Sequence, residues 1–182
     1  GGFGRKSKAD FAKEAAFLSK EVGAPVRVQW TREDDLKHSF YHTTSVEKID
    51  VGLDADNKVI AWRHRSAAPS FLSTFAPDTG VQHPVEIGMG LEDLPYEVDN
   101  ISAEQCKAMA HTRVGWYRSV SNIPRAFATQ SITAELANEL GKDQKDFLLE
   151  LIGSDRKLDW EACGLPQRFW NHDEPLDHFP FD

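Results

Sequence analysis

The amino-acid sequence predicts a mixed α+β fold. Three patterns support this class: helical periodicity near the start, an alternating pattern interrupted by turn formers in the middle, and two further helical patterns after Pro124. Hydrophobic residues make up 40% of the 182 residues, enough for a packed core. We interpret the chain as one folded segment with three parts: residues 1–66 (a glycine turn, a helix and a hairpin), 67–100 (an irregular excursion) and 101–182 (a segment around Arg118, two helices and a loop-rich tail).

The first predicted helix covers about residues 8–22. Its apolar residues recur at intervals of three or four, which is the spacing of one buried helical face: Phe11, Ala15, Leu18 and Val22. Ser7 is placed to cap the start of this helix, and Gly23 is placed to end it. Residues 25–30 then alternate between apolar and polar side chains, which predicts a strand with one buried face.

The clearest hairpin pattern follows. Residues 45–53 and 59–65 are extended in pattern, and the turn formers at 54–57 separate them. Residues 68–95 are rich in Pro, Gly, Ser and Asp, so we expect a long irregular excursion there. Excursions of this length in compact proteins tend to be functional or to cover another surface.

The last third predicts a short strand at 101–109 and two helices. Pro124 suits the first turn of the longer helix, which carries a four-residue ladder: Ala128, Ile132, Leu136 and Leu140. A second helix is expected at 144–152, with Gly153 at its end. The tail after Ser154 is expected to be mostly loop, anchored by five aromatic residues: Trp160, Phe169, Trp170, Phe179 and Phe181.

Composition excludes several classes of protein. The net charge of −8 argues against a broad nucleic-acid-binding surface, which needs an excess of cations. No apolar run approaches the roughly 18 residues of a membrane span. The two cysteines, Cys106 and Cys163, cannot by themselves form a disulfide framework or ligate an iron–sulfur cluster. The glycine-rich start and the abrupt finish lead us to expect an internal segment of a longer polypeptide.

The opening motif is Gly1-Gly2-Phe3-Gly4-Arg5-Lys6-Ser7. It lacks the glycine directly before the lysine that a phosphate-binding P-loop requires, and it lacks the third glycine of a dinucleotide fingerprint. Glycines do let a backbone approach a ligand closely, and the N–H groups that open a following helix favour an anion. A structural turn and an anion-binding turn both remain open on this pattern.

The seven histidines do not form a zinc-binding pattern. Only His38 and His42 share the spacing of one helical face, and no further Cys or His joins them at ligand spacing, so we predict no direct metal ligation. His42 lies just before a predicted strand and is either a polar contact to a ligand or a solvent-facing loop residue. The acidic run at 33–35 is interpreted as an exposed turn rather than a carboxylate site.

Arg118 is the strongest single candidate for anion binding. Trp116, Tyr117 and Ser119 flank it, and a predicted helix begins a few residues later. An arginine held in this setting can clamp a phosphate or oxo group through a planar two-point contact. A purely structural arginine remains equally open. No nucleophile elbow and no cysteine in a reactive setting accompanies it.

Three stretches together resemble the large molybdenum-binding subunit of the xanthine dehydrogenase and aldehyde oxidase family: residues 1–6, the Trp-Thr-Arg-Glu-Asp-Asp run at 30–35, and the Gly-Trp-Tyr-Arg-Ser-Val run at 115–120. Within that family, the branch formed by the beta subunits of isoquinoline 1-oxidoreductase is the most similar. The resemblance runs over almost the whole chain, and it implies that the segment is part of a molybdopterin-binding domain.

The resemblance implies roles for particular residues. At the cofactor it places Gly2, Phe3, Gly4, Arg118 and Ser119. It also implies that the glycine turn and the Arg118 guanidinium converge in space. At substrate-contacting positions it places Ser7, His42 and Val120. Because purine-hydroxylating members carry a glutamate, an arginine and an aromatic residue at those three positions, an aldehyde or a nitrogen heteroaromatic fits better than xanthine.

The family's reaction is a hydroxylation that uses water as the oxygen source. The resemblance implies a molybdopterin cytosine dinucleotide carrying molybdenum, and a small partner subunit with two 2Fe–2S clusters that receives the electrons. The family's general-base glutamate lies downstream of this segment, so we expect no catalytic residue within it and no activity from it alone. Two other hypotheses remain: a non-catalytic α+β module for assembly or partner binding, and an independent anion-binding domain.

Overall fold

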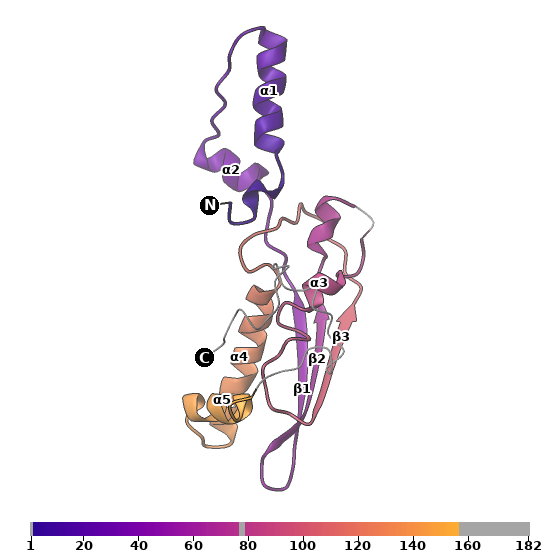
Figure 1. Ribbon diagram of the computed structural model, residues 1–182, viewed down its shortest axis with the longest axis vertical. Helices are drawn as coiled ribbons and strands as arrows, with labels where there is room; N and C mark the ends of the chain where they lie inside the picture. Colours follow the sequence, from indigo (N-terminus) through magenta and orange to yellow (C-terminus); the bar gives the residue numbers. More distant parts are fainter. Residues whose placement is uncertain (1, 77–78, 157–182) are drawn as a thin grey trace.

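The computed structural model describes residues 2–76 and 79–156, and it confirms the α+β class (Figure 1). The helices are α1 (Asp10–Val22), α2 (Arg32–His38), α3 (Pro84–Ile87), α4 (Asn122–Glu139) and α5 (Gln144–Ile152). The strands are β1 (Val46–Leu53), β2 (Val59–Ala67) and β3 (Asn100–Cys106). Short 3-10 helices cover Arg5–Ser7 and Phe71–Thr74. In Figure 1 the sheet, α4 and α5 form one end of the molecule, and α1 and α2 stand at the other.

The predicted hairpin is confirmed. β1 and β2 pair antiparallel, and the Asp54 carboxylate closes the turn by accepting the N–H groups of Asp56 and Lys58, each at 2.9 Å. Asn57 takes a φ of 64°, a left-handed conformation that asparagine tolerates in turns. The third strand, β3, begins within one residue of its predicted start and pairs with β2 in parallel. A parallel pair needs a crossover connection, and the excursion supplies it.

The main core lies between the sheet and the two C-terminal helices. Its buried members are Val59, Trp62, Tyr96, Ala137, Phe147 and Leu151. The Trp62 and Tyr96 rings meet edge to face, with centroids 5.3 Å apart. Asp143 caps α5, and Gly153 ends that helix as predicted. This core fixes the hairpin against α4 and α5.

The buried face of α4 differs from the prediction. The ladder of Ile132, Leu136 and Leu140 is only partly buried, whereas Arg125, Thr129 and Thr133 are each at most 5% exposed. The threonines can be buried because each hydroxyl donates to the carbonyl one turn earlier, Thr129 to Arg125 at 2.9 Å and Thr133 to Thr129 at 2.8 Å. Apolar periodicity therefore identified the helix but not its inner face.

The excursion contains more structure than predicted. It holds the 3-10 helix at Phe71–Thr74 and the short helix α3. Phe71, Val114 and Val120 form a second core there, flanked by Leu72, Val85, Met89 and Ala110. This second core connects the excursion to the segment that precedes α4.

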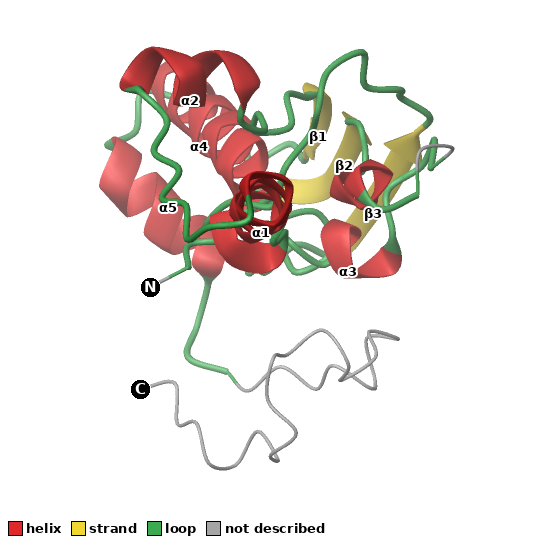
Figure 2. Cartoon of the chain, turned by 90° about the horizontal axis from the view of Figure 1, so that it is seen from above, coloured by secondary structure: helices red, strands yellow, loops and turns green. Residues whose placement is uncertain are grey.

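The helix α1 forms where predicted, but its apolar face is not buried. Phe11 is 42% exposed and Val22 is 66% exposed, because α1 extends away from the sheet along the long axis of the molecule (Figure 1), so that Figure 2 shows it end-on. Its start also differs: Ala9 takes the N-cap position, while the Ser7 hydroxyl donates to the carbonyl of Gly4 at 2.6 Å. Gly23 ends the helix with a φ of 69°, as predicted.

The predicted strand at 25–30 is wrong, because no described residue pairs with this segment as a ladder. The alternation is real: Val26, Val28 and Trp30 are half-buried and their neighbours are exposed. The Trp30 indole N–H donates to Glu14 of α1 at 3.0 Å, so the segment packs on a helix rather than in a sheet.

The acidic run predicted as a turn is the first turn of α2. Thr31 and Asp34 form a capping box: the Asp34 N–H donates to the Thr31 hydroxyl at 3.1 Å, and the Thr31 N–H donates to the Asp34 carboxylate at 3.2 Å. None of the described helices has the length and apolar content to cross a membrane.

The five aromatic anchors predicted in the tail lie outside the described residues.

Candidate cofactor-binding site

Three segments that are far apart in the sequence meet in one place: residues 2–8, 39–42 and 113–120. The Tyr41 backbone joins the second to the third. Its N–H donates to the carbonyl of Arg113 at 2.8 Å, and its carbonyl accepts the N–H of Gly115 at 2.8 Å. We call this meeting point the turn–arginine site.

The glycine turn packs directly on the backbone that carries Arg118. The Arg118 N–H donates to the carbonyl of Phe3 at 3.0 Å. At Gly4, which has a φ of 83°, a Cβ atom would lie 1.8 Å from the carbonyl oxygen of Trp116. Only glycine fits there, because both the positive φ and the absence of a side chain are required. The structure thus brings together the two motifs that the resemblance assigns to one cofactor.

Backbone strain is concentrated at this site. Phe3, Ser119 and Val120 have φ values of 47°, 67° and 41°, and among the described residues Asn57 in the hairpin turn is the one other non-glycine with positive φ. Each such residue costs about 1–3 kcal/mol, and strain of this kind gathers at functional sites.

Arg118 and Arg5 differ in their partners. The Arg5 guanidinium donates to both carboxylate oxygens of Asp10, at 2.8 and 3.0 Å, and this hydrogen bonding lowers the pKa of the Asp10 carboxyl. The Arg118 side chain is exposed, and its guanidinium lies 5.9 Å from the centroid of the Phe3 ring. Within the described residues no carboxylate pairs with it. Of these two arginines, Arg118 is the one that is open to an external anion.

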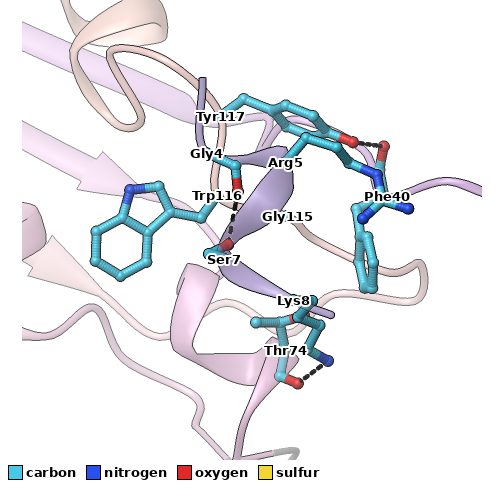
Figure 3. A pocket seen from close by; sticks show the side chains of 9 residues that line it. All are labelled: Gly4, Arg5, Ser7, Lys8, Phe40, Thr74, Gly115, Trp116 and Tyr117. Carbon is cyan, nitrogen blue, oxygen red and sulfur yellow. Dashed lines mark hydrogen bonds between the residues drawn. The ribbon is translucent and has the colours of Figure 1, made fainter. Parts of the chain in front are cut away.

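A small pocket behind the turn is closed by internal hydrogen bonds (Figure 3). The Ser7 hydroxyl donates to the Gly4 carbonyl, and the Lys8 ammonium donates to the carbonyl of Thr74. The Tyr117 hydroxyl donates to the carbonyl of Phe40 at 2.8 Å. These contacts brace the turn from the side of the 3-10 helix at Phe71–Thr74.

The three predicted substrate-contacting residues take different positions. His42 is half-buried beside Tyr117, with ring centroids 5.6 Å apart, so it lies next to the Arg118 segment. Ser7 is exposed at the glycine turn. Val120 is 7% exposed and packs in the second core with Phe71. The Val120 side chain therefore presents little surface to a ligand, and its substrate contact stays a prediction.

Sequence reasoning missed the contribution of Tyr117 and its neighbours in the second segment. The Tyr117 hydroxyl lies 3.1 Å from the Ser39 hydroxyl in addition to its bond to Phe40. The Trp-Tyr pair before Arg118 was visible in the sequence, but nothing local indicated that residues 39–42 would pair with it. In the part of the chain that the structure describes, no three His, Cys, Asp or Glu side chains gather as metal ligands, and Cys106 is free and exposed.

Residues 1–149 match the family model described as the molybdopterin cofactor-binding domain. The chain therefore belongs to this family, and the predicted resemblance to the xanthine dehydrogenase family is confirmed.

Three curated relatives resemble the chain. A subunit of nicotinate dehydrogenase from Pseudomonas putida is 31% identical over 97% of this chain and 15% of its own length. The beta subunit of isoquinoline 1-oxidoreductase from Brevundimonas diminuta is 27% identical over 82% of this chain and 20% of its own. A membrane-bound aldehyde dehydrogenase of Gluconacetobacter polyoxogenes, named for pyrroloquinoline quinone, is 29% identical over 84% of this chain and 21% of its own. The chain thus spans about a fifth or less of the length of these relatives.

Proposed function

We propose that this chain forms one wall of the cofactor site in the catalytic subunit of a molybdenum hydroxylase. The observation that carries the proposal is the direct contact between the glycine turn and the arginine segment, made by the Arg118 N–H and the Phe3 carbonyl at 3.0 Å. Neither local sequence nor the main core requires these two motifs to meet.

The residues at the site fit an anionic pterin cofactor. Within the turn the N–H groups of Arg5 and Ser7 already donate to the carbonyls of Gly2 and Gly4, at 3.0 and 3.1 Å. The N–H groups of Phe3 and Gly4 donate to no described residue, so we assign these two to the ligand. Arg118 supplies an open guanidinium for a two-point contact with a phosphate or oxo group, and Ser119 adds a hydroxyl beside it. When bound, the molybdopterin cytosine dinucleotide with its molybdenum would supply the two-electron oxidation of the substrate, with water as the oxygen source.

We propose an aldehyde or a nitrogen heteroaromatic as the substrate. The names of the three relatives refer to nicotinate, to isoquinoline and to an aldehyde. Ser7 and His42 lie on the exposed and half-buried surface around the site, so both can contact a small molecule held there. Val120 does not support this role, because its side chain lies in the second core.

The proposal includes partners that complete the enzyme. The general-base glutamate would come from another part of the large subunit, and a small subunit with two 2Fe–2S clusters would receive the electrons. Two relatives are named as subunits, which supports a multi-subunit assembly. The chain's own contribution is to bind and orient the cofactor and to exclude water behind the turn.

Cofactor analysis of the complete protein tests the proposal. We expect about one molybdenum and one pterin per protomer, measured by mass spectrometry of the metal and by fluorescence of the oxidised pterin. The name of the Gluconacetobacter relative refers to a quinone cofactor. An active preparation that contains such a quinone and no molybdenum would contradict the proposed function. A folded protein with no cofactor would favour the non-catalytic assembly module.

Replacing Arg118 tests the role of its guanidinium. We expect Arg118→Ala to lower the bound pterin about tenfold or more, because a charge-assisted contact to the cofactor is lost. The matched control is Arg113→Ala on the same segment. Its side chain donates to the Lys37 carbonyl at the surface and to no other residue that the structure describes. Equal pterin content in the wild type and in Arg118→Ala would remove Arg118 from the site.

A further inference from the structure

The strip of residues 69–74 contacts two of the three segments of the turn–arginine site and the residue that directly follows the third. The Pro69 carbonyl accepts the Thr43 hydroxyl at 2.9 Å, next to His42. The Phe71 ring packs on Trp116 with centroids 4.2 Å apart. The Thr74 carbonyl accepts the Lys8 ammonium behind the glycine turn. The strip therefore supports the glycine turn and the Arg118 segment directly, and it holds the chain just after the His42 segment.

One carboxylate holds the strip at its centre. Glu86 of α3 is fully buried, and its Oε1 accepts the Phe71 N–H at 2.9 Å. Its Oε2 accepts the Ser70 hydroxyl at 2.5 Å and the His83 N–H at 2.8 Å. Both oxygens thus bind donors, and two of the three donors belong to the start of the 3-10 helix.

The Glu86 carboxylate is held by neutral donors. Among the described residues no cation lies within ion-pair distance of it. The neighbouring Arg125 instead donates to the backbone carbonyls of Glu86 and Met89 and to the Gln82 side chain at 2.6 Å. Arg125 thus fixes α3 from the side of α4, and Glu86 transmits that position to the strip. Burying a carboxylate outside ion-pair distance of a cation is costly, and a purely apolar contact would avoid that cost.

We propose that Glu86 is a positioning residue for the cofactor site. It acts through residues 69–74 on the glycine turn, on the His42 segment and on the Arg118 segment, and it touches none of the reacting groups itself. This inference rests on the proposed function, because the segments it positions are those assigned to the cofactor. It names a residue that no motif of the sequence indicated.

The test compares Glu86→Gln with Glu97→Gln in the complete protein. Glutamine keeps the size of the side chain, but one carboxylate oxygen becomes an NH2 group that cannot accept from Ser70, His83 or Phe71. Glu97 is the matched control, since its carboxylate also binds a loop N–H, that of Ser154 at 2.9 Å, but at the other end of the molecule. The readout is hydrogen exchange of peptides 2–8, 41–43 and 115–120, together with pterin content.

We expect Glu86→Gln to raise exchange in all three peptides by about tenfold and to lower pterin content, while Glu97→Gln changes neither. If Glu86→Gln changes exchange in these peptides no more than Glu97→Gln does, the positioning role is overturned. If Glu86→Gln does not fold, Ser70→Ala removes one donor with less disturbance and must raise exchange in the same peptides. A wild-type protein without molybdenum and pterin would refute the proposed function, whereas the exchange comparison would still decide the role of Glu86.

Discussion

The end of the molecule around β2, α4 and α5 is held by an apolar core, whereas the turn–arginine site is held by backbone contacts. At the first end Trp62, Phe147 and Leu151 are almost completely buried. At the second end Phe3 is 65% exposed, and the segments are joined by hydrogen bonds, by the glycine contact and by strained backbone.

Because of this difference, we expect the residues that stabilise the fold and the residues that bind the cofactor to be largely different ones. An apolar core tolerates substitutions of similar volume, because the hydrophobic effect has no preferred direction. A backbone contact at a strained turn tolerates almost none, because its geometry is specific. We therefore expect changes at the core end to alter the free energy of unfolding, and changes at the site to alter cofactor binding first.

The largest effect is expected for Gly4→Ala. The added Cβ would lie 1.8 Å from the Trp116 carbonyl oxygen and 2.8 Å from the Tyr117 Cα, and neither backbone atom can rotate away. We expect the turn to separate from the Arg118 segment, with loss of bound pterin and faster hydrogen exchange in residues 2–8. Gly23→Ala is the control, because Gly23 has a similar φ of 69° but a Cβ atom added there would meet no atom within 4 Å. It should lower the free energy of unfolding by only about 1–2 kcal/mol. Equal effects of the two substitutions would contradict the close contact.

Phe147→Ala tests the core end. Phe147 is 1% exposed, so we expect a loss of about 3–5 kcal/mol in the free energy of unfolding from the lost burial and the cavity. Urea denaturation of the complete protein measures it, and pterin content per folded molecule should stay unchanged. Leu149→Ala on the outer side of α5, where the residue is 53% exposed, is the control. An equal loss in the free energy of unfolding for Leu149→Ala would mean that another surface covers α5.

Asp143→Ala measures how much a single local cap adds at the core end. The Asp143 carboxylate accepts the N–H groups of Lys145 and Asp146, at 2.9 and 3.1 Å. Its loss should cost about 1 kcal/mol by urea denaturation, less than the loss of Phe147. Asp143→Asn keeps an acceptor at the cap and should cost clearly less. A larger cost for asparagine than for alanine would rule out the capping explanation.

The smallest effect on the free energy of unfolding is expected from a change of pH, which acts through the Glu47 carboxylate and its hydrogen-bond partners. Burial raises the pKa of the Glu47 carboxyl, but hydrogen bonds from His64 at 2.9 Å and Ser66 at 2.9 Å outweigh it and keep this pKa below its ordinary value. The unfolded chain then takes up the proton more readily than the folded one. The stabilisation is complete above the ordinary carboxyl pKa of about 4.3 and is lost as the pH falls through the lower folded-state pKa.

Urea denaturation at several pH values from neutral to acidic measures this dependence. In Glu47→Gln the group can no longer titrate, so its unfolding free energy should fall less steeply on acidification than that of the wild type. Identical slopes for the two proteins would exclude Glu47 as a source of acid sensitivity.

Local features of the sequence determined the elements of this protein. The hairpin follows from the Asp and Asn turn formers at 54–57, and α1, α4 and α5 follow from apolar spacing and from their end residues, such as Gly23 and Asp143. Thr31 and Asp34 show that a further local signal, the capping box of α2, was present in the sequence but was interpreted as part of a turn. Each of these features acts over a few residues, so neighbours in the sequence are enough to predict it.

Only the tertiary structure decided which faces are buried and which segments meet. It buried the threonines of α4 in place of the apolar ladder, left the apolar face of α1 exposed and turned Val120 into the second core. It also placed Glu86 beneath the strip that supports the site. The resemblance to a known family led us to expect Phe3 near Arg118, but the spacing of residues did not. Contacts between distant segments depend on how whole elements pack, and no local pattern records that packing.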